Sequence, residues 1–424
     1  MQSIRICRLL SSPAMTSSRW NDATLDAMRQ VGDPLADEAV AKLLASGNLS
    51  AVQTLMNTLV RNDQPVPQDL PPELQEYFAA TADFTLPELK RIEAGEQFFA
   101  THGPEILLTL GCFSLPAAYA ARKGVQVLYR TGYLAKRPNR RLFETTQMVV
   151  DVMTPGGLGP NGKGIRTAQK VRLMHAAVRH LIINDPEHPW DSAKLGVPIN
   201  QEDLAGTLMT FSEIVLQGLT ALHIRYDEQG AAAYLDAWRA IGHIMGLRPE
   251  MIPDTLEEAT FLTKTIHDRQ IAPSEEGRLM TAALLEMMEA NVPLKIFDDI
   301  PASLMRLLFE GYPGVADGLG IPEHVLEDKL VAIATSVGGR IASLIDAEAH
   351  RHRLLRGLSL AFIQFWINAD RGGKRTNFTI PDSLKTYWGL PDEVEPSVWE
   401  RLGRWINGDD KDKGKDKGSE DGEA

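Results

Sequence analysis

Apolar residues recur at helical spacing over a long stretch of this 424-residue chain, from Pro104 to about Ala369. Windows such as "NQEDLAGTLMTFSEIVLQGLTALHI" and "GRLMTAALLEMMEANVPLKIF" place them three and four residues apart, which puts them on one side of a helix. We find no run of alternating β-branched residues between turn residues that would indicate a sheet. The sequence therefore predicts an all-α fold.

Charge and proline content divide the chain into predicted segments. Proline-rich connectors such as "QPVPQDLPPE" occur early, and the final stretch "GDDKDKGKDKGSEDGEA" has no apolar residue except its terminal alanine. A stretch of this composition buries too little apolar surface to fold. We predict a flexible N-terminus over 1–17, an N-terminal helical flank over 18–103, a core over 104–369, a C-terminal segment packed on the core over 370–406, and a disordered charged tail over 407–424.

Two helix starts are indicated by capping residues. Asn200 in "NQEDLAG" and Asp254 in "PDTLEEA" each precede acidic residues, which the helix dipole favours in the first turn. We expect both residues to be N-caps.

Composition excludes several classes of protein. The net charge of −12, without a dense Lys/Arg cluster, argues against a nucleic-acid partner. Two cysteines, Cys7 and Cys112, cannot build a disulfide framework or a cysteine metal cluster. The first residues fit a secretory signal poorly, and the longest uncharged run, Ile106–Ala121, is shorter than the roughly 20 residues of a membrane span. We expect a cytoplasmic protein with no stable membrane span.

A glycine-rich loop, "PGGLGPNGKG" over Pro155–Gly164, contains both a G-x-G-x-x-G and a G-x-x-x-x-G-K pattern. The phosphate-loop pattern needs Ser or Thr after the lysine, where this chain has Gly164. The dinucleotide pattern needs a preceding strand, but "RRLFETTQMVVDVM" before the loop has helical spacing. We therefore interpret the loop as a helix-to-helix connection.

The segment after this loop, Lys163–Ile182, predicts an amphipathic helix with two histidines. His175 lies at the centre of a stripe that we expect to be buried, formed with Ala168, Val171, Val178 and Ile182. His180 points away from that line, on the side of Gln169 and Ala176, and is expected at the surface or in a hydrogen bond. The spacing leaves two interpretations of His175 open: a core histidine with a hydrogen-bond partner, or an axial ligand of haem iron.

The helix before the loop has polar residues at the head of its apolar stripe. Arg141 and Thr145 are one turn apart and continue into the apolar side chains of Met148 and Val152. Burying a charge costs several kcal/mol unless it is paired, so we expect the core to hold a partner for this cation. Glu144 is either that partner or a residue of the same cavity. Other metal sites are not indicated, because no H-E-x-x-H motif occurs and the "HRH" at His350–His352 is flanked by arginine.

These segments together resemble the MpaB-like oxygenase family, which includes the rubber oxygenases known as latex clearing proteins. The similarity covers about Leu107 to Leu294 and is carried by "RRLFETTQMVVDVM", "GKGIRTAQKVRLMHAAVRHLI", "PINQEDLAGTLMTFS" and "YLDAWRAIGHIMGL". The R-x-x-E-T and R-L-M-H-A-A-V-R-H elements, in this order, are its most specific part.

The resemblance implies a globin-like helical core with additional flanking helices that binds haem b, so that 104–369 is a haem-binding oxygenase core. His175 matches the ligand of the iron. Arg141 and Thr145 match polar residues of the distal pocket, where they are expected to donate hydrogen bonds to bound oxygen. Thr207, on a stripe with Phe211, Ile214, Gly218 and Leu222, matches a pocket threonine. The implied reaction is oxidative cleavage of a carbon–carbon double bond of an isoprenoid by dioxygen.

The chain departs from the family pattern in two respects. Some rubber-cleaving members have a lysine where this chain has Glu144, which is expected to orient Arg141 or to act as a base. The poor fit of the first residues to an export signal favours a smaller isoprenoid or another unsaturated lipid over solid rubber as the substrate. A haem-binding sensor or carrier and a helical protein without haem are the alternatives, and the sequence leaves monomer and homodimer open.

Overall fold

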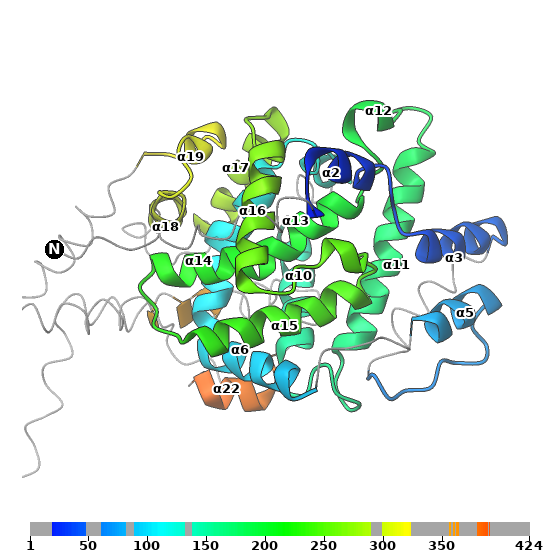
Figure 1. Ribbon diagram of the computed structural model, residues 1–424, viewed down its shortest axis with the longest axis horizontal. Helices are drawn as coiled ribbons and strands as arrows, with labels where there is room; N and C mark the ends of the chain where they lie inside the picture. Colours follow the sequence, from blue (N-terminus) through cyan, green and yellow to red (C-terminus); the bar gives the residue numbers. More distant parts are fainter. Residues whose placement is uncertain are drawn as a thin grey trace, which may run out of the picture.

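The structure is a computed structural model that describes residues 19–47, 61–81, 89–131, 138–289, 299–323 and 380–388, with 356–357, 359–360, 362–363 and 390. For 138–143 it describes the backbone alone. These ranges contain helices and turns but no strand, and one isolated bridge pairs Ala121 with Ile271 (Figure 1). The all-α prediction is confirmed. The predicted flexible N-terminus 1–17, the charged tail 407–424 and the "HRH" at 350–352 lie outside the described residues.

The described helices follow one another along the chain with short connections. In order they are α2 (Asp22–Met28), α3 (Pro34–Ala45), α5 (Pro72–Ala80), α6 (Leu89–Thr109), the π-helix η1 (Leu110–Ser114), α7 (Leu115–Ala120), α8 (Val125–Arg130), α10 (Pro138–Met153), α11 (Gly164–Ile183), α12 (Ser192–Leu195), α13 (Gln201–Phe211), α14 (Glu213–Ala221), α15 (Glu228–Ile244), the 3-10 helix η2 (Pro249–Met251), α16 (Leu256–Gln270), α17 (Glu275–Glu289), α18 (Ile300–Leu308), α19 (Val315–Gly318) and α22 (Asp382–Trp388).

The main core is built around α6 and α15, the pair with the most extensive contact. Gly95 of α6 lies against α15 so closely that a Cβ atom would come within 2.3 Å of the carbonyl oxygen of Ala233. Around this contact lie large side chains that are fully buried, among them Phe99, Tyr234 and Trp238. Burying a side chain of this size contributes about 2–3 kcal/mol, so this contact dominates the packing of the core.

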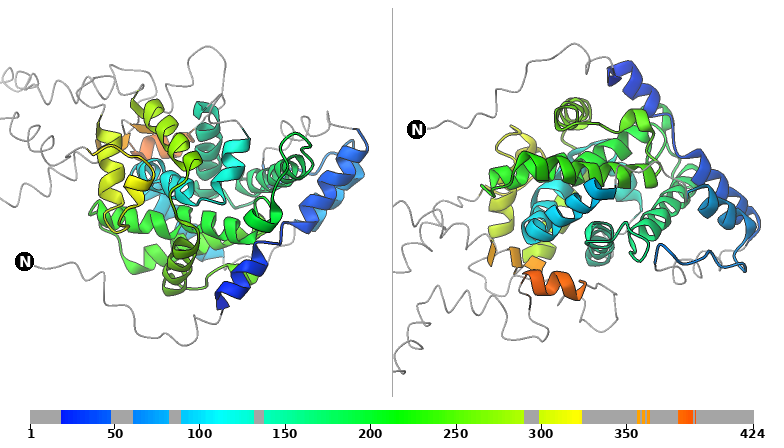
Figure 2. Two further views of the ribbon diagram at one scale, coloured as in Figure 1. Left: turned by 90° about the horizontal axis from the view of Figure 1, so that it is seen from above. Right: turned by 60° about the horizontal axis from the view of Figure 1, so that its bottom comes forward.

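A second, smaller apolar cluster joins the N-terminal flank to α11. Tyr77 and Phe78 of α5 and Leu43 of α3 pack on Leu173 and Ala176 of α11. Figures 1 and 2 show α3 and α5 on the outer side of α11. α11 therefore lies between the flank on one side and the main core on the other.

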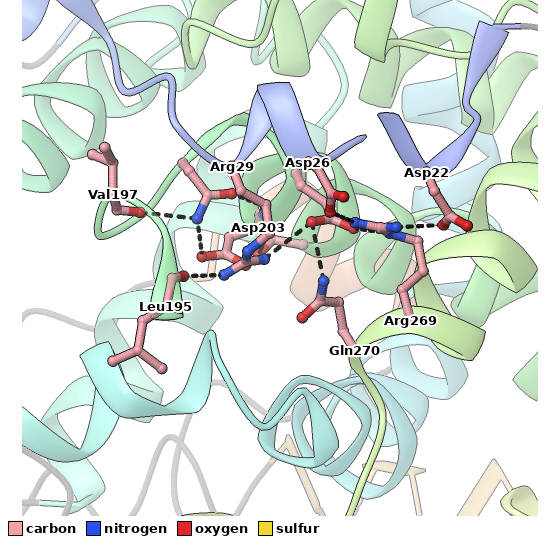
Figure 3. Close-up of polar contacts among 11 residues, drawn as sticks. Asp22, Asp26, Arg29, Leu195, Val197, Asp203, Arg269 and Gln270 are labelled. Atoms are coloured by element: carbon pink, nitrogen blue, oxygen red, sulfur yellow. Dashed lines mark hydrogen bonds and ion pairs between the residues drawn. The ribbon is translucent and has the colours of Figure 1, made fainter. Parts of the chain in front are cut away.

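A network of ion pairs holds α2 on α13 and α16 (Figure 3). The buried Arg29 guanidinium donates to Glu202 at 3.1 Å and to Asp203 at 2.9 Å. Arg269 of α16 donates to the same Glu202 at 2.8 Å and to Asp26 at 2.6 Å. Glu202 is fully buried, and two guanidinium groups offset the cost of burying its charge.

The uncharged run 106–121, which is too short for a membrane span, continues from α6 through η1 into α7. Pro104 inside α6 has no N–H, which leaves the carbonyl of Ala100 without its helical donor. The indole Nε1 of Trp388 in α22 donates to that carbonyl at 2.9 Å, and Gly103 leaves room for the ring. α22, within the segment predicted to pack on the core, is therefore docked on α6. None of the described helices is long and apolar enough to cross a membrane.

A second interruption separates α13 from α14 at Ser212, whose φ and ψ are −110° and −81°. The interruption frees backbone carbonyls, and side chains from distant helices bind two of them: Ser114 Oγ donates to Thr210 at 2.6 Å and Tyr234 Oη donates to Phe211 at 2.9 Å. Both carbonyls are thus satisfied inside the core.

The two predicted helix caps had different outcomes. Asn200 caps α13 by accepting the N–H of Asp203, as expected. Asp254 is not the cap of α16, because Thr255 accepts the N–H of Glu258 there. The carboxylate of Asp254 instead pairs with Arg19, at 3.1 Å, and with Arg239. These long-range arginine partners are invisible to a local capping rule.

Replacing Gly103 with Ala should destabilise the fold, although alanine normally favours a helix. The new Cβ atom would lie 2.2 Å from Cζ2 of Trp388, so the indole must move from its carbonyl partner. We expect a loss of about 1–3 kcal/mol in the free energy of unfolding by urea denaturation. Gly311→Ala is the control, since no atom lies within 4 Å of its new Cβ. Equal stability of the two variants would contradict the docking of Trp388.

Candidate functional site

Helices α10 and α11, which follow each other along the chain and contact each other, carry most of the predicted site. Asp151, near the end of α10, accepts hydrogen bonds from Thr167 Oγ1 of α11 at 2.9 Å and from Gln147 Nε2 at 2.8 Å. Burial raises the pKa of the Asp151 carboxyl, and these two donors oppose the rise. The Asp151–Thr167 bond joins the last turn of α10 to the first turn of α11.

Glu144 and Thr145 lie on α10, seven and six residues before Asp151, and His175 lies on α11, eight residues after Thr167. The structure therefore places these candidates on two helices that contact each other. Arg141 lies one turn further towards the start of α10, and its side chain lies outside the described residues.

The two described candidates on α10 differ in exposure. Thr145 is half-buried, whereas Glu144 is exposed. Further along the face of Thr145, Met148 is half-buried and packs against the main core, and Val152 is fully buried. The apolar stripe that Arg141 and Thr145 head is therefore a real core-facing stripe.

His175 is half-buried and lies at the margin of the buried face of α11, so the prediction that it lies at the centre is wrong. Ala168 and Ile182, the ends of the predicted stripe, are buried, but Val171 and Val178 are half-buried like His175. The fully buried residues lie further round the helix, because α3 and α5 cover that side: Gln169, Arg172, Leu173, Ala176 and Arg179.

His180 was predicted to face outward, but the side of α11 on which it lies is partly covered. Gln169 and Ala176, which share that side, are buried, and His180 is half-buried. Amphipathicity alone could not show this, because the partner of that side comes from a segment about 130 residues earlier in the chain.

Thr207 does not lie on an inward stripe. It is exposed, and its hydroxyl donates to the carbonyl of Asp203 in its own helix at 2.8 Å. Ile214, Gly218 and Leu222 are buried as expected, but they follow the interruption at Ser212. The interruption changes the helical phase, so positions before and after it do not share one face.

Two buried arginines of α11 were not predicted as part of the site. Arg172 pairs with Asp33, and Arg179 pairs with Asp37 of α3. The available signal was their spacing: both arginines fall on the stripe of Ala176, where an unpaired charge would not be tolerated.

The glycine loop is a helix-to-helix connection, as predicted, and its amide groups bind a carboxylate of this chain. The N–H groups of Gly156 and Leu158 donate to the two oxygens of Glu96, at 2.7 and 3.0 Å. Asn62 Nδ2 donates to the carbonyls of Gly157 and Gly159. Donors that a phosphate would need already bind the buried Glu96, which excludes the nucleotide interpretation.

The donor chemistry around His175 fits a haem group. The described residues contain no group of three or more His, Cys, Asp or Glu side chains that could hold a metal ion. Haem iron needs only one protein ligand, because the porphyrin supplies four nitrogens. A half-buried imidazole with the half-buried apolar neighbours Val171 and Val178 on its helix is suited to that role.

The fold and the site together define an all-α protein with a half-buried imidazole on one of two contacting helices that follow each other along the chain. The family model described as "ER-bound oxygenase mpaB/B'/Rubber oxygenase, catalytic domain" matches residues 100–335, more than half of the chain, and the chain belongs to this family. This membership confirms the resemblance noted in the sequence and supports oxygenase activity.

Two relatives agree with this assignment. The chain is 28% identical to the rubber oxygenase of Streptomyces sp. (strain K30) over 306 residues, which are 72% of this chain and 74% of that protein. The solved structure of latex clearing protein in the closed state shares the fold, with a TM-score of 0.66, 24% identity, and coverage of 89% of this chain and 90% of that chain.

Replacing Asp151 with Asn should change the pH dependence of stability. Above the ordinary value of 3.8 and up to the raised pKa, the folded protein keeps a proton at Asp151 that the unfolded chain has lost. The free energy of unfolding therefore falls as the pH rises through this interval, and Asn removes that contribution. Urea unfolding across this pH range should show the wild type losing stability relative to Asp151→Asn. A difference independent of pH would contradict the burial of this carboxyl.

Proposed function

We propose that this protein is a haem b-dependent oxygenase that cleaves a carbon–carbon double bond of an isoprenoid or another unsaturated lipid with dioxygen. Membership of the oxygenase family supports the reaction class. The observation that carries the proposal is the contact between α10, which carries the half-buried Thr145, and α11, which carries the half-buried His175; the Asp151–Thr167 hydrogen bond joins these two helices. A ligand of the iron and a hydrogen-bond donor for oxygen are thereby supplied by two adjacent helices.

His175 would hold the haem, and the haem supplies the activation of dioxygen. The imidazole must be neutral to bind the iron, because only a ring nitrogen with a free lone pair can act as a ligand. The main contribution of α11 is thus to hold one nitrogen lone pair in a fixed direction.

Thr145 and Arg141 would act on the oxygen-binding side. Thr145 has a hydroxyl donor on a half-buried part of α10, and Arg141 contributes a permanent cation one turn away. Donors directed at a site where negative charge develops lower the barrier, because they need no reorganisation during the reaction. Thr207, exposed and bonded to its own helix, has no role in this proposal.

Glu144 has two possible roles, as a base or as a residue that orients Arg141. Its exposure allows proton exchange with solvent, which a base that turns over must have. The family relative is named a rubber oxygenase, and the same bond type occurs in smaller isoprenoids.

His175→Ala should abolish haem binding in protein expressed with added haem. We expect the Soret band of the purified wild type to be lost in the variant while the far-UV circular dichroism remains. His180→Ala, a histidine five residues along the same helix, is the matched control and should keep the band. A wild-type protein without a Soret band after haem supply would sink the proposed function.

Arg141→Ala should keep haem and lose activity. Removal of one donor to developing negative charge costs about 10²–10³ in kcat. Oxygen uptake with carbonyl products measures the activity, and Arg140→Ala makes the same chemical change about 100° round the helix. Unaltered kcat in Arg141→Ala would remove this residue from the mechanism.

Glu144→Gln separates the two roles of that residue in the same assay. Glutamine still accepts a hydrogen bond from arginine but cannot take up a proton, so a kcat as low as that of Arg141→Ala indicates a base, and a kcat near the wild type indicates an orienting role.

A further inference from the structure

The buried side of α11 is fixed by two arginine–aspartate pairs that reach it from the N-terminal flank. Arg172 binds Asp33 through two bonds, Nε to Oδ2 at 2.5 Å and Nη2 to Oδ1 at 2.8 Å, and also donates to the carbonyl of Ile244 at 3.3 Å. Asp33 is only 5% exposed and Arg172 9%. A bidentate pair of this kind restrains direction as well as distance.

The second pair repeats this arrangement about two turns further along α11. Arg179, 3% exposed, pairs with Asp37 through Nη1, and donates to the carbonyls of Pro198 at 2.8 Å and Ile199 at 2.9 Å. Three groups on two segments therefore bind one guanidinium. Because the guanidinium of Arg179 is fixed in this way, α11 has little freedom to move.

The two aspartates are themselves fixed at the start of α3. Asp33 is the N-cap of this helix, and Asp37 accepts the backbone N–H of Asp33 at 3.1 Å. Glycines leave room for both pairs: a Cβ on Gly246, whose φ is +85°, would lie 2.5 Å from Asp33 Oδ2, and one on Gly32 would lie 2.9 Å from Asp37 Oδ2. These contacts hold both carboxylates in place independently of their bonds to the arginines.

The pairs bracket His175. Arg172 precedes it by three residues and Arg179 follows it by four, which places them about 60° and 40° round the helix from the histidine. Anchors on both sides of a residue prevent rotation of the helix about its axis at that point. The direction of the imidazole follows the rotation of the helix, because Cβ is fixed to the backbone.

We propose that Asp33 and Asp37 are positioning residues for His175: they fix the rotation of α11 and so the direction in which the imidazole presents its ligand nitrogen. This inference rests on the proposed function of His175. Both aspartates lie outside the matched region 100–335, so part of the site's support comes from the N-terminal flank rather than from the catalytic domain. The flank is then needed for the site and is not a separate module.

The test uses full-length wild type, Asp33→Asn, Asp37→Asn and the control Glu38→Gln. Asparagine is a good N-cap and still accepts the N–H of Asp33, so each variant removes the charge while keeping the local bonds. Glu38 lies on the same helix, is 66% exposed and pairs only with Lys42 among the contacts described, so its variant makes the same charge change away from α11. If Asp33→Asn does not fold, the Asp37→Asn variant alone decides the outcome, since the side chain of Asp37 is 33% exposed.

Hydrogen exchange of the peptides spanning α11, measured without haem, reports whether the aspartates hold this helix. We expect exchange about tenfold faster in both aspartate variants and unchanged in Glu38→Gln, because breaking a buried pair leaves an uncompensated charge. Unchanged exchange in α11 would overturn the proposal. This measurement does not depend on haem, so it remains decisive if the wild type binds none and the proposed function fails.

Haem titration reports whether holding the helix matters to His175. We expect about tenfold weaker haem binding in the aspartate variants. At equal haem occupancy we also expect a shifted Soret band, which a general loss of stability would not cause in molecules that are still folded and loaded. Wild-type affinity together with a wild-type band in both variants would overturn the proposal.

Discussion

Two guanidinium groups on the buried side of α11 impose the constraint on which the arrangement around His175 depends. A charge can be buried only where partners replace its lost hydration, so Arg172 and Arg179 require carboxylates and carbonyls in fixed places. The partners come from α3, from the loop before α13 and from the end of α15. One helix therefore binds three separate parts of the chain, and the same contacts that make its burial possible also determine which of its sides faces the main core.

The rest of the helical assembly follows the same rule for backbone groups. Pro104 and the interruption at Ser212 free carbonyls inside the core, and Trp388, Ser114 and Tyr234 bind them. In the glycine loop the free groups are amides, and the buried Glu96 binds them. In each case the irregularity leaves a backbone group without its helical partner, and a residue distant in the sequence binds that group. Without this bond, the unsatisfied polar group in the core would cost more free energy than the irregularity itself. These contacts join α22, α15 and α6 to distant parts of the chain.

Local patterns predicted much of this fold. The helical class, the bounds of α10 and α11 to within about two residues, the cap at Asn200 and the connecting role of the glycine loop follow from spacing, capping and turn chemistry, which act over a few residues. Where a distant partner intervenes, local patterns failed. Asp254 binds arginines rather than capping α16, Thr207 is separated from its predicted stripe by Ser212, and His175 lies at the margin of the buried side because α3 and α5 cover its other flank. The predicted segment boundaries and the oligomeric state stay predictions.

The sequence by itself determined that the chain is helical, that His175 lies on an amphipathic helix after a glycine loop, and that Arg141, Glu144 and Thr145 lie on the helix before it. Helical periodicity and short-range sterics are sufficient for these conclusions. Only the tertiary structure decided which side of α11 is buried, the contact of α10 with α11, and the pairing of Asp33 and Asp37 with the arginines of α11. Those features depend on pairing between charges and carbonyls, some of which lie more than a hundred residues apart. The sequence alone does not show which of these groups pair.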